Sequence, residues 1–139
     1  MKVFLDNKSF APERAHNTDA GYDLRATEYG IIYGNSNRTF DTGVHIQLPP
    51  GTCGILVSKS GLNVNHNITS TGLIDEGYTG SIRVKLYNHG DEPFVVNEGD
   101  KISQLIIVPV KYEPVDIVYD LAELGESERG INGFGSTGR

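Results

Sequence analysis

Apolar residues occupy every second position in several short segments, and this alternation constrains the fold more than any other feature of the sequence. It is clearest in residues 44–48 and 81–86, where Val, Ile and Leu alternate with His, Gln, Arg or Lys. In a strand, successive side chains point to opposite faces, so a period of two predicts a strand that is buried on one side. Both segments are therefore predicted to be half-buried strands.

Two longer apolar runs, at residues 52–58 and 102–110, predict more fully buried strands. Gly, Pro, Asn and Asp clusters between the runs predict tight turns. A turn or two near residues 119–124 is the only helix that we expect. A chain of 139 residues with 17 glycines and short, evenly spaced strands fits one all-β domain, an antiparallel sandwich or jelly roll.

Charge and composition exclude several classes of protein. The net charge of −6 argues against a nucleic-acid or membrane-surface binder, which needs a basic face, but permits one anionic ligand held by local cations. Cys53 is the only cysteine and lies in an apolar run, where we expect a small buried hydrophobe. The four histidines lack metal-ligand spacing. With no secretory signal or membrane span expected, we predict a cytoplasmic protein, of the cell or of an infected host.

The last eleven residues, 129–139, cannot form a core element. They combine Arg129, Phe134, a Ser136–Thr137 pair and four glycines with no apolar period. Glycines allow backbone N–H groups to approach phosphate oxygens, the hydroxyls and Arg129 add donors, and Phe134 offers a flat face for a base. We therefore divide the chain into a β jelly-roll domain, 1–128, and a glycine-rich tail, 129–139, that closes over a ligand.

Five segments carry polar or glycine-rich residues that strand formation does not require. They are AGYDLRA (20–26), SKSGL (58–62), GLIDEGYTG (72–80), GDKISQLI (99–106) and the tail. Each alone has an ordinary structural explanation, such as a surface ion pair, a plain turn or a polar residue at a sheet edge. The occurrence of all five in this order is not plausibly due to chance.

In that order and with those residues, the chain closely resembles the trimeric dUTPases. The resemblance implies a dUTPase-like β-clip or jelly roll and a homotrimer, with active sites at subunit contacts. It also implies magnesium-assisted hydrolysis of dUTP to dUMP and pyrophosphate, which keeps uracil out of DNA and supplies dUMP for thymidylate synthesis.

The resemblance assigns a role to individual residues. Asp75 matches the family's water-activating aspartate, consistent with the need for a base in hydrolysis. Asp23 matches an acidic residue that holds Mg²⁺ in its outer shell through water. The residues implied to bind the phosphates are Lys59, Ser60, Gly61 and Gln104, with Arg129, Gly135, Ser136 and Thr137 of the tail.

Selectivity for uracil and deoxyribose is implied in the third segment. The backbone of Gly72, Leu73 and Ile74 would pair with the uracil edge, and Tyr78 would pack on the sugar and exclude a 2′-hydroxyl. Phe134 would stack on the base. Thr69 and Arg83 complete the expected substrate-binding residues. Lys59 stands where most family members have arginine, so the bidentate phosphate contact is lost.

Two other functions remain open. A dCTP deaminase shares the third segment, but it needs a glutamate base where this chain has Lys85. A nucleotide-responsive protein that controls a regulatory partner would use the tail and the predicted loop around residues 29–38, and this role could coexist with catalysis.

Overall fold

The computed structural model describes residues 1–128, 130 and 131. The tail residues Arg129, Phe134, Gly135, Ser136 and Thr137 lie outside the described residues. The elements in chain order are β1 (Lys2–Leu5), β2 (Gly21–Arg25), β3 (Gly30–Ile32), β4 (Ser36–Asp41), β5 (Val44–Gln47), β6 (Thr52–Val57), α1 (Ser60–His66), β7 (Ile68–Ile74), β8 (Arg83–Asn88), β9 (Phe94–Val96), β10 (Lys101–Pro109) and the 3₁₀ helix η1 (Leu121–Leu124). The predicted all-β fold class is confirmed.

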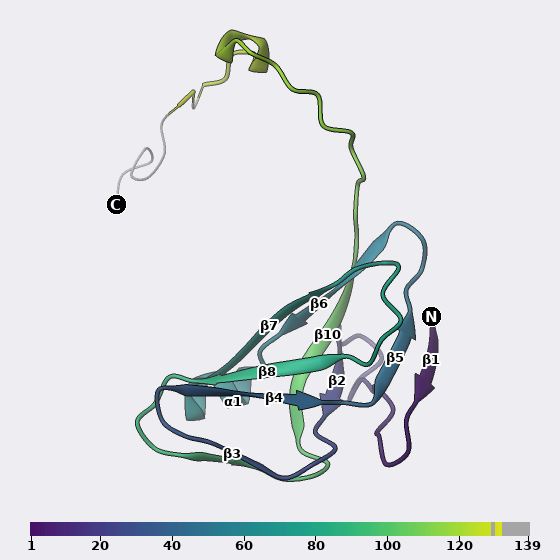
Figure 1. Ribbon diagram of the computed structural model, residues 1–139, viewed down its shortest axis with the longest axis vertical. Coiled ribbons are helices and arrows are strands. Elements are labelled where there is room, and N and C mark those ends of the chain that lie inside the picture. The colour runs from purple at the N-terminus through teal and green to yellow at the C-terminus, as the bar shows by residue number, and fades with distance from the viewer. Residues whose placement is uncertain (129, 132–139) are drawn as a thin grey trace.

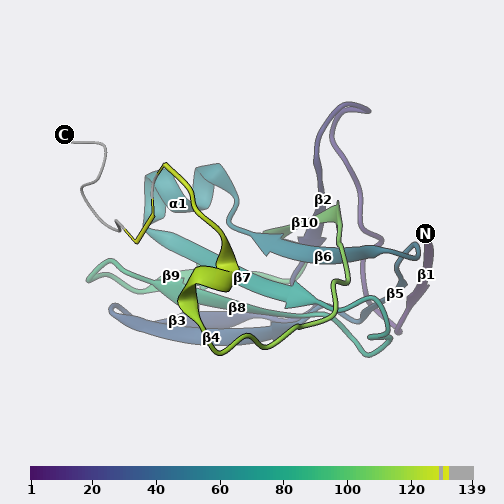
Figure 2. The ribbon, with the colours of Figure 1, turned by 90° about the horizontal axis from the view of Figure 1, so that it is seen from above.

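Six strands form one antiparallel sheet in the order β2–β10–β6–β7–β8–β4. Two smaller antiparallel pairs, β1–β5 and β3–β9, complete the fold. The strands wrap around a common interior, as Figures 1 and 2 show from two directions. β10 lies between β2 and β6, so the polar residue Gln104 sits within the sheet, and not at its edge.

The core follows the predicted alternation. Val44 and Ile46 of β5 are buried, whereas Gln47 is exposed. Ile82, Val84 and Leu86 are also fully buried, and Cys53 is a buried free thiol, as expected. The largest fully buried side chains, which fill the interior of the curled sheet, are Phe40, Leu24, Ile32, Ile68, Ile82, Leu86, Ile102 and Leu105.

Three expected elements differ in the structure. The strand predicted at 81–86 begins at Arg83, and the predicted loop around 29–38 contains β3 and the start of β4. The SKSGL turn opens α1, which the sequence did not reveal. Although Leu62 packs against the core, the seven residues of α1 are too few to show the repeating apolar period by which an amphipathic helix is recognised. At the expected helix position the structure has η1, capped by Asp120 and Glu123.

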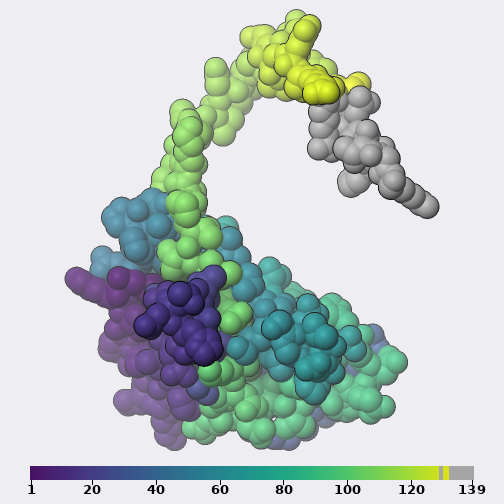
Figure 3. Space-filling model, turned by 180° about the vertical axis from the view of Figure 1, so that it is seen from behind, coloured from purple at the N-terminus to yellow at the C-terminus, as the bar shows by residue number. Residues whose placement is uncertain are grey.

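The chain leaves the body after β10 and extends away from it as an arm, residues 111–128 (Figures 1 and 3). The arm exposes apolar side chains, including Val115 and Tyr119, which are 88% and 96% exposed. Exposed apolar residues at this density are typical of a segment that packs against another molecule. Among the described residues, neither helix has the length and apolar character required to cross a bilayer.

Candidate functional site

The buried carboxylate of Asp23 is the centre of the first group of candidate residues. It lies on β2, next to β10, and is only 4% exposed. The Lys59 ammonium contacts its Oδ1 at 2.5 Å and the Lys101 ammonium contacts its Oδ2 at 2.7 Å. The Gln104 amide lies 3.4 Å from Oδ1. The fold thus brings together Asp23, Lys59 and Gln104 from three segments that the sequence separates widely.

The two lysines control the ionisation of Asp23. Burial raises the pKa of a carboxyl group, but the hydrogen bonds and charges of Lys101 and Lys59 outweigh burial here, so the pKa of Asp23 lies below its ordinary value. The bond to Asp23 in turn raises the pKa of Lys101. Asp23 is therefore a carboxylate at neutral pH, paired on both oxygens.

Two further charged residues, Glu13 and Arg25, lie next to Asp23 and its two lysines. Glu13 lies 3.6 Å from the Lys101 ammonium and 2.5 Å from the Arg25 guanidinium. Arg25 also donates to the Gly99 carbonyl at 2.7 Å, which holds the Gly99–Asp100 turn against β2. The Arg25 contact is the largest cause of a lowered pKa at Glu13. Asp23 and Arg25, two residues apart on β2, do not pair with each other, because among the described residues each has another partner.

Serine hydroxyls that are buried or half-buried fix the backbone next to Lys59 and Gln104, the two phosphate-binding candidates. The Ser58 hydroxyl accepts from the Ser70 N–H at 2.9 Å and donates to the Ser70 carbonyl at 3.1 Å. The Ser103 hydroxyl donates to the Val57 carbonyl at 3.0 Å and contacts the Ser70 hydroxyl at 2.8 Å. Because Ser58 precedes Lys59 and Ser103 precedes Gln104, this network sets the spacing between the two side chains.

The start of α1 provides backbone donors beside Lys59. The cap residue Lys59 is extended, and its side chain makes no capping hydrogen bond. Ser60 and Gly61 are exposed in the first turn, where N–H groups have no acceptor within the helix. These donors and the Lys59 ammonium together suit an anionic ligand.

Asp75 lies at the far end of β7, in an exposed turn. Its carbonyl accepts from the Tyr78 N–H at 3.0 Å. The neighbouring Glu76 carboxylate accepts from the Gly51 N–H at 2.9 Å and from the Tyr112 hydroxyl at 2.6 Å. These two bonds, the Tyr112 bond first, lower the pKa of Glu76. The same contact raises the pKa of Tyr112.

Tyr78 is held against the backbone of its own loop. Its hydroxyl donates to the Ser81 carbonyl at 2.9 Å. A Cβ added at Gly80 would lie 2.5 Å from the Tyr78 hydroxyl oxygen, so any side chain there would displace the ring. Glycine at position 80 therefore sets the position of Tyr78.

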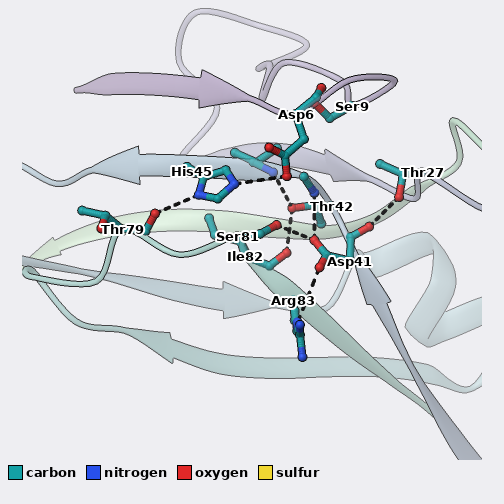
Figure 4. Close-up of polar contacts among 12 residues, drawn as sticks. Asp6, Ser9, Thr27, Asp41, Thr42, His45, Thr79, Ser81, Ile82 and Arg83 are labelled. Carbon is teal, nitrogen blue, oxygen red and sulfur yellow. Dashed lines mark hydrogen bonds and ion pairs between the residues drawn. The ribbon is translucent and has the colours of Figure 1, made fainter.

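A polar network supports this loop from the β4–β5 side (Figure 4). The His45 ring contacts the Thr79 carbonyl at 2.8 Å and the Asp6 carboxylate at 3.2 Å, and both contacts raise the pKa of His45. Asp41 accepts from the Ser81 hydroxyl and from the Gly43 N–H. Burial raises the pKa of Asp41, but the hydrogen bonds from Ser81 and Gly43 outweigh it and leave the value lowered.

The strand that leads to Asp75 has one unpaired edge. Residues 71–74 of β7 pair with β6, whereas β7 pairs with β8 only over residues 68–70. Within the described residues, no ladder continues from β8 along 71–74, so backbone groups of Gly72, Leu73 and Ile74 remain available to a ligand. Gly72 also has a packing role, because a Cβ there would lie 2.9 Å from the Leu56 side chain.

Thr69 and Arg83 have local partners. The Thr69 hydroxyl contacts the His89 ring at 2.7 Å. The Arg83 side chain is 72% exposed and lies 3.5 Å from Asp41. Neither lies in the Asp23 cluster.

The structure therefore divides the candidate residues into two groups at opposite ends of the sheet. The register places Ile74 beside Gly54, so Asp75 lies level with Cys53, six residues before Lys59. At about 3.3 Å per residue, this corresponds to roughly 20 Å along the strand. One protomer does not bring Asp75 to the Lys59–Gln104 cluster.

Three residues of the site, Lys101, Glu13 and Glu76, were not predicted from the sequence. Lys101 lies within the fourth segment, directly before an apolar strand. This position was the only feature of the sequence that could have indicated a role for Lys101 in the site. Among the described residues, no group of three or more His, Cys, Asp or Glu side chains is arranged to hold a metal ion.

Comparison with known proteins gives consistent matches along the chain. A family model described as dUTPase matches residues 7–138. A deoxyuridine 5′-triphosphate nucleotidohydrolase of Clostridium acetobutylicum is 42% identical over 137 residues, covering 96% of this chain and 92% of the relative. One from Kluyveromyces lactis is 39% identical over 129 residues, covering 92% and 86%.

Solved structures show the same likeness. The Staphylococcus bacteriophage 80alpha dUTPase with dUpNHpp superposes with a TM-score of 0.91 at 28% identity, covering 99% of this chain and 98% of that one. A mutant dUTPase from phage phi11 of S. aureus, described with a structural Mg(II) ion, has a TM-score of 0.80 at 28% identity, covering 87% and 97%.

Proposed function

The chain belongs to the dUTPase family, and we propose that it hydrolyses dUTP to dUMP and pyrophosphate with Asp75 as the base that activates the attacking water. The observation that carries this proposal is the family match over residues 7–138, which includes the first four chemistry-bearing segments and residues 129–138 of the tail. As a nucleotide hydrolase, the protein is proposed to act in the cytoplasm of the cell or of an infected host.

Asp75 is suited to the role of a general base. Its side chain is exposed, while the turn that carries it is fixed by the Tyr78 N–H and by the two bonds of Glu76. A carboxylate held in this way can orient a water toward the α-phosphorus and take its proton as the phosphorus–oxygen bond forms. The bond between the α-phosphorus and the oxygen that bridges the α- and β-phosphates then breaks, and pyrophosphate leaves.

The phosphates are proposed to bind at the opposite group of residues. Lys59, Gln104 and the first-turn amides near Ser60 and Gly61 supply charge and hydrogen-bond donors for the triphosphate. Arg129, Gly135, Ser136 and Thr137 of the tail are proposed to close over the same phosphates, with Phe134 on the base.

Uracil selectivity is proposed to reside in the free edge of β7. On the side of residues 71–74 that faces away from β6, backbone N–H and C=O groups are available for hydrogen bonding. The edge of a pyrimidine base can form hydrogen bonds with them. Tyr78, positioned over Gly80, would pack on the deoxyribose and leave no room for a 2′-hydroxyl. Thr69 and Arg83 are proposed to complete the substrate-binding residues.

The separation of Asp75 from Lys59 supports a shared site. If one protomer supplies Asp75 and another supplies Lys59 and Gln104, the two groups meet at a subunit contact, as in the proposed homotrimer. The extended arm, with its exposed apolar residues, also needs a surface to cover it.

Magnesium is proposed as the cofactor. The described residues offer no multi-ligand metal cluster, and both oxygens of Asp23 face ammonium groups. This donor set fits an ion that takes most of its oxygen ligands from phosphates and water, with Asp23 contacting it only through water. When bound, such an ion neutralises phosphate charge and fixes phosphate geometry.

Release of pyrophosphate from dUTP, dTTP, dCTP and UTP, measured in parallel with Mg²⁺, tests the proposal. Turnover of dUTP alone is the expected result. Ammonia release from dCTP would instead indicate a deaminase. The position of the deaminase's glutamate base is held here by Lys85, a cation whose ammonium lies over the Tyr87 ring, 5.2 Å from its centroid.

We propose a second role, control of a partner protein, that would coexist with catalysis. It is supported by the likeness to the phage 80alpha dUTPase, which is described as controlling transfer of virulence genes by a G protein-like mechanism. Pull-downs from the host with and without dUTP test it, since a nucleotide-dependent partner is required.

A further inference from the structure

Asp23 is shared by two lysines that come from different elements. Lys59 precedes α1 and contacts one carboxylate oxygen, while Lys101 begins β10 and contacts the other. The Asp23 side chain is 6% exposed, compared with 23% for Lys59 and 31% for Lys101. The carboxylate is therefore enclosed, and the two ammonium groups lie between it and solvent.

This arrangement conflicts with the proposed role of Lys59. To bind a phosphate, the Lys59 ammonium must give up at least part of its contact with Asp23. A buried carboxylate that loses its only counter-charge carries a large desolvation cost. With one lysine, nucleotide binding would have to bear that cost.

Lys101 is positioned to remove this cost. Its ammonium faces Asp23 on one side and Glu13 on the other, at 2.7 and 3.6 Å. Arg25, the remaining charge in the cluster, is already engaged by Glu13 and the Gly99 carbonyl. Among the described residues, two carboxylates thus hold Lys101, whereas Lys59 has a single anionic partner and lies at the exposed start of a helix.

We propose that Lys101 is a positioning residue for nucleotide binding: it stays on Asp23 when the triphosphate draws Lys59 away, so that the buried carboxylate is never left unpaired. The inference rests on the proposed function, because it assumes that a nucleotide triphosphate binds at Lys59. Asp23 and Lys101 form a fixed pair, and Lys59 is the exchangeable partner.

A double-mutant cycle with Lys101→Met and Asp23→Asn tests the proposal. The readout is the dissociation constant for dUpNHpp, a non-hydrolysable analogue, measured by calorimetry with the full chain and constant Mg²⁺. Lys101→Met should weaken binding by about tenfold in the wild-type background, and by less than about threefold with Asp23→Asn, as expected for coupled residues in contact. Circular dichroism and thermal melting establish that each variant folds.

Two further variants separate positioning from general structural damage. Lys101→Arg keeps a cation beside Asp23 and should restore affinity to near the wild-type value. Lys111→Met removes a lysine paired with exposed Glu113 and should leave affinity unchanged. At saturating dUTP, Lys101→Met should show near wild-type kcat, because the loss falls on KM.

Nuclear magnetic resonance of the lysine ammonium groups gives a second readout that needs no variant of Asp23. Addition of dUpNHpp should shift the Lys59 signal strongly and leave the Lys101 signal nearly in place. Comparable shifts of both signals, or equal losses of affinity in both backgrounds of the cycle, would mean that Lys101 itself binds phosphate, and would overturn the inference. Failure of the wild-type chain to bind dUpNHpp would overturn the proposed function together with it.

Discussion

Tyr112 donates a 2.6 Å hydrogen bond to Glu76, and this contact joins the first residues of the arm to the turn that carries Asp75. Glu76 also holds the Gly51 N–H, so one carboxylate links the proposed catalytic turn, the β5–β6 connection and the arm. The position of the arm and the orientation of Asp75 are therefore mechanically connected in each protomer.

Tyr112→Phe should lower kcat for dUTP while leaving the fold intact. The substitution removes one hydrogen bond from an exposed site, so the loss should be much smaller than the loss on replacing Asp75. Tyr119→Phe is the matched control, because Tyr119 is a 96% exposed arm residue. Equal activity of the two variants would show that the Tyr112–Glu76 bond does not influence the Asp75 turn. The measurement is steady-state pyrophosphate release.

Asp75→Asn should bind dUpNHpp with near wild-type affinity and lose at least about 100-fold in turnover, the low end of general-base contributions. The amide keeps the size of the side chain but cannot take a proton from water. Calorimetry gives the affinity and pyrophosphate release gives the rate. Turnover that survives this change would remove Asp75 from the base role.

Two inactive variants should complement each other if the site is shared between protomers. Asp75→Asn and Lys59→Met are each expected to be inactive alone. After joint unfolding and refolding, random mixed trimers should have about a quarter of their sites intact, since each site takes the two residues from different protomers. Light scattering establishes the oligomeric state. A mixture that stays inactive would place both residues of a site in one protomer.

Gly80→Ala should reduce the discrimination of dUTP against UTP. The added methyl group would overlap the Tyr78 ring and displace it from the proposed sugar-binding position. Gly77→Ala is the matched control, because no atom of the described residues, apart from Gly77 and its chain neighbours, lies within 4 Å of the Cβ position there. The ratio of kcat/KM for dUTP and UTP is the measurement. An unchanged ratio in both variants would mean that Tyr78 does not select the sugar.

His45 should make the stability of the protein depend on pH. The Thr79 carbonyl and the Asp6 carboxylate raise the pKa of His45 above its ordinary 6.5. Because this pKa is raised, the contribution of His45 to folding stability is fully present below about pH 6.5. It is lost as pH rises through the higher pKa that His45 has in the folded protein. The melting temperature of wild type should therefore exceed that of His45→Asn by more at pH 6 than at pH 8.5. His16→Asn, at an exposed loop position, is the control. A difference that does not vary with pH would contradict this prediction.

The local pattern was sufficient for four of the ten strands, β5, β6, β8 and β10. Alternation located β5 and the buried residues Ile82, Val84 and Leu86, and the apolar runs located β6 and β10. Such patterns work because burial on one face repeats every second residue. α1 was missed because its seven residues are too few to show a repeating apolar period.

The sequence by itself determined the fold class, the family resemblance and the five segments that carry polar chemistry. Only the tertiary structure decided which of these segments meet. Lys59 and Lys101 converge on Asp23 because β10 pairs with both β2 and β6, and Asp75 lies far from them because β7 carries it to the other end of the sheet. Strand formation depends on neighbours in sequence, whereas these contacts depend on strand order and register, which no single segment encodes.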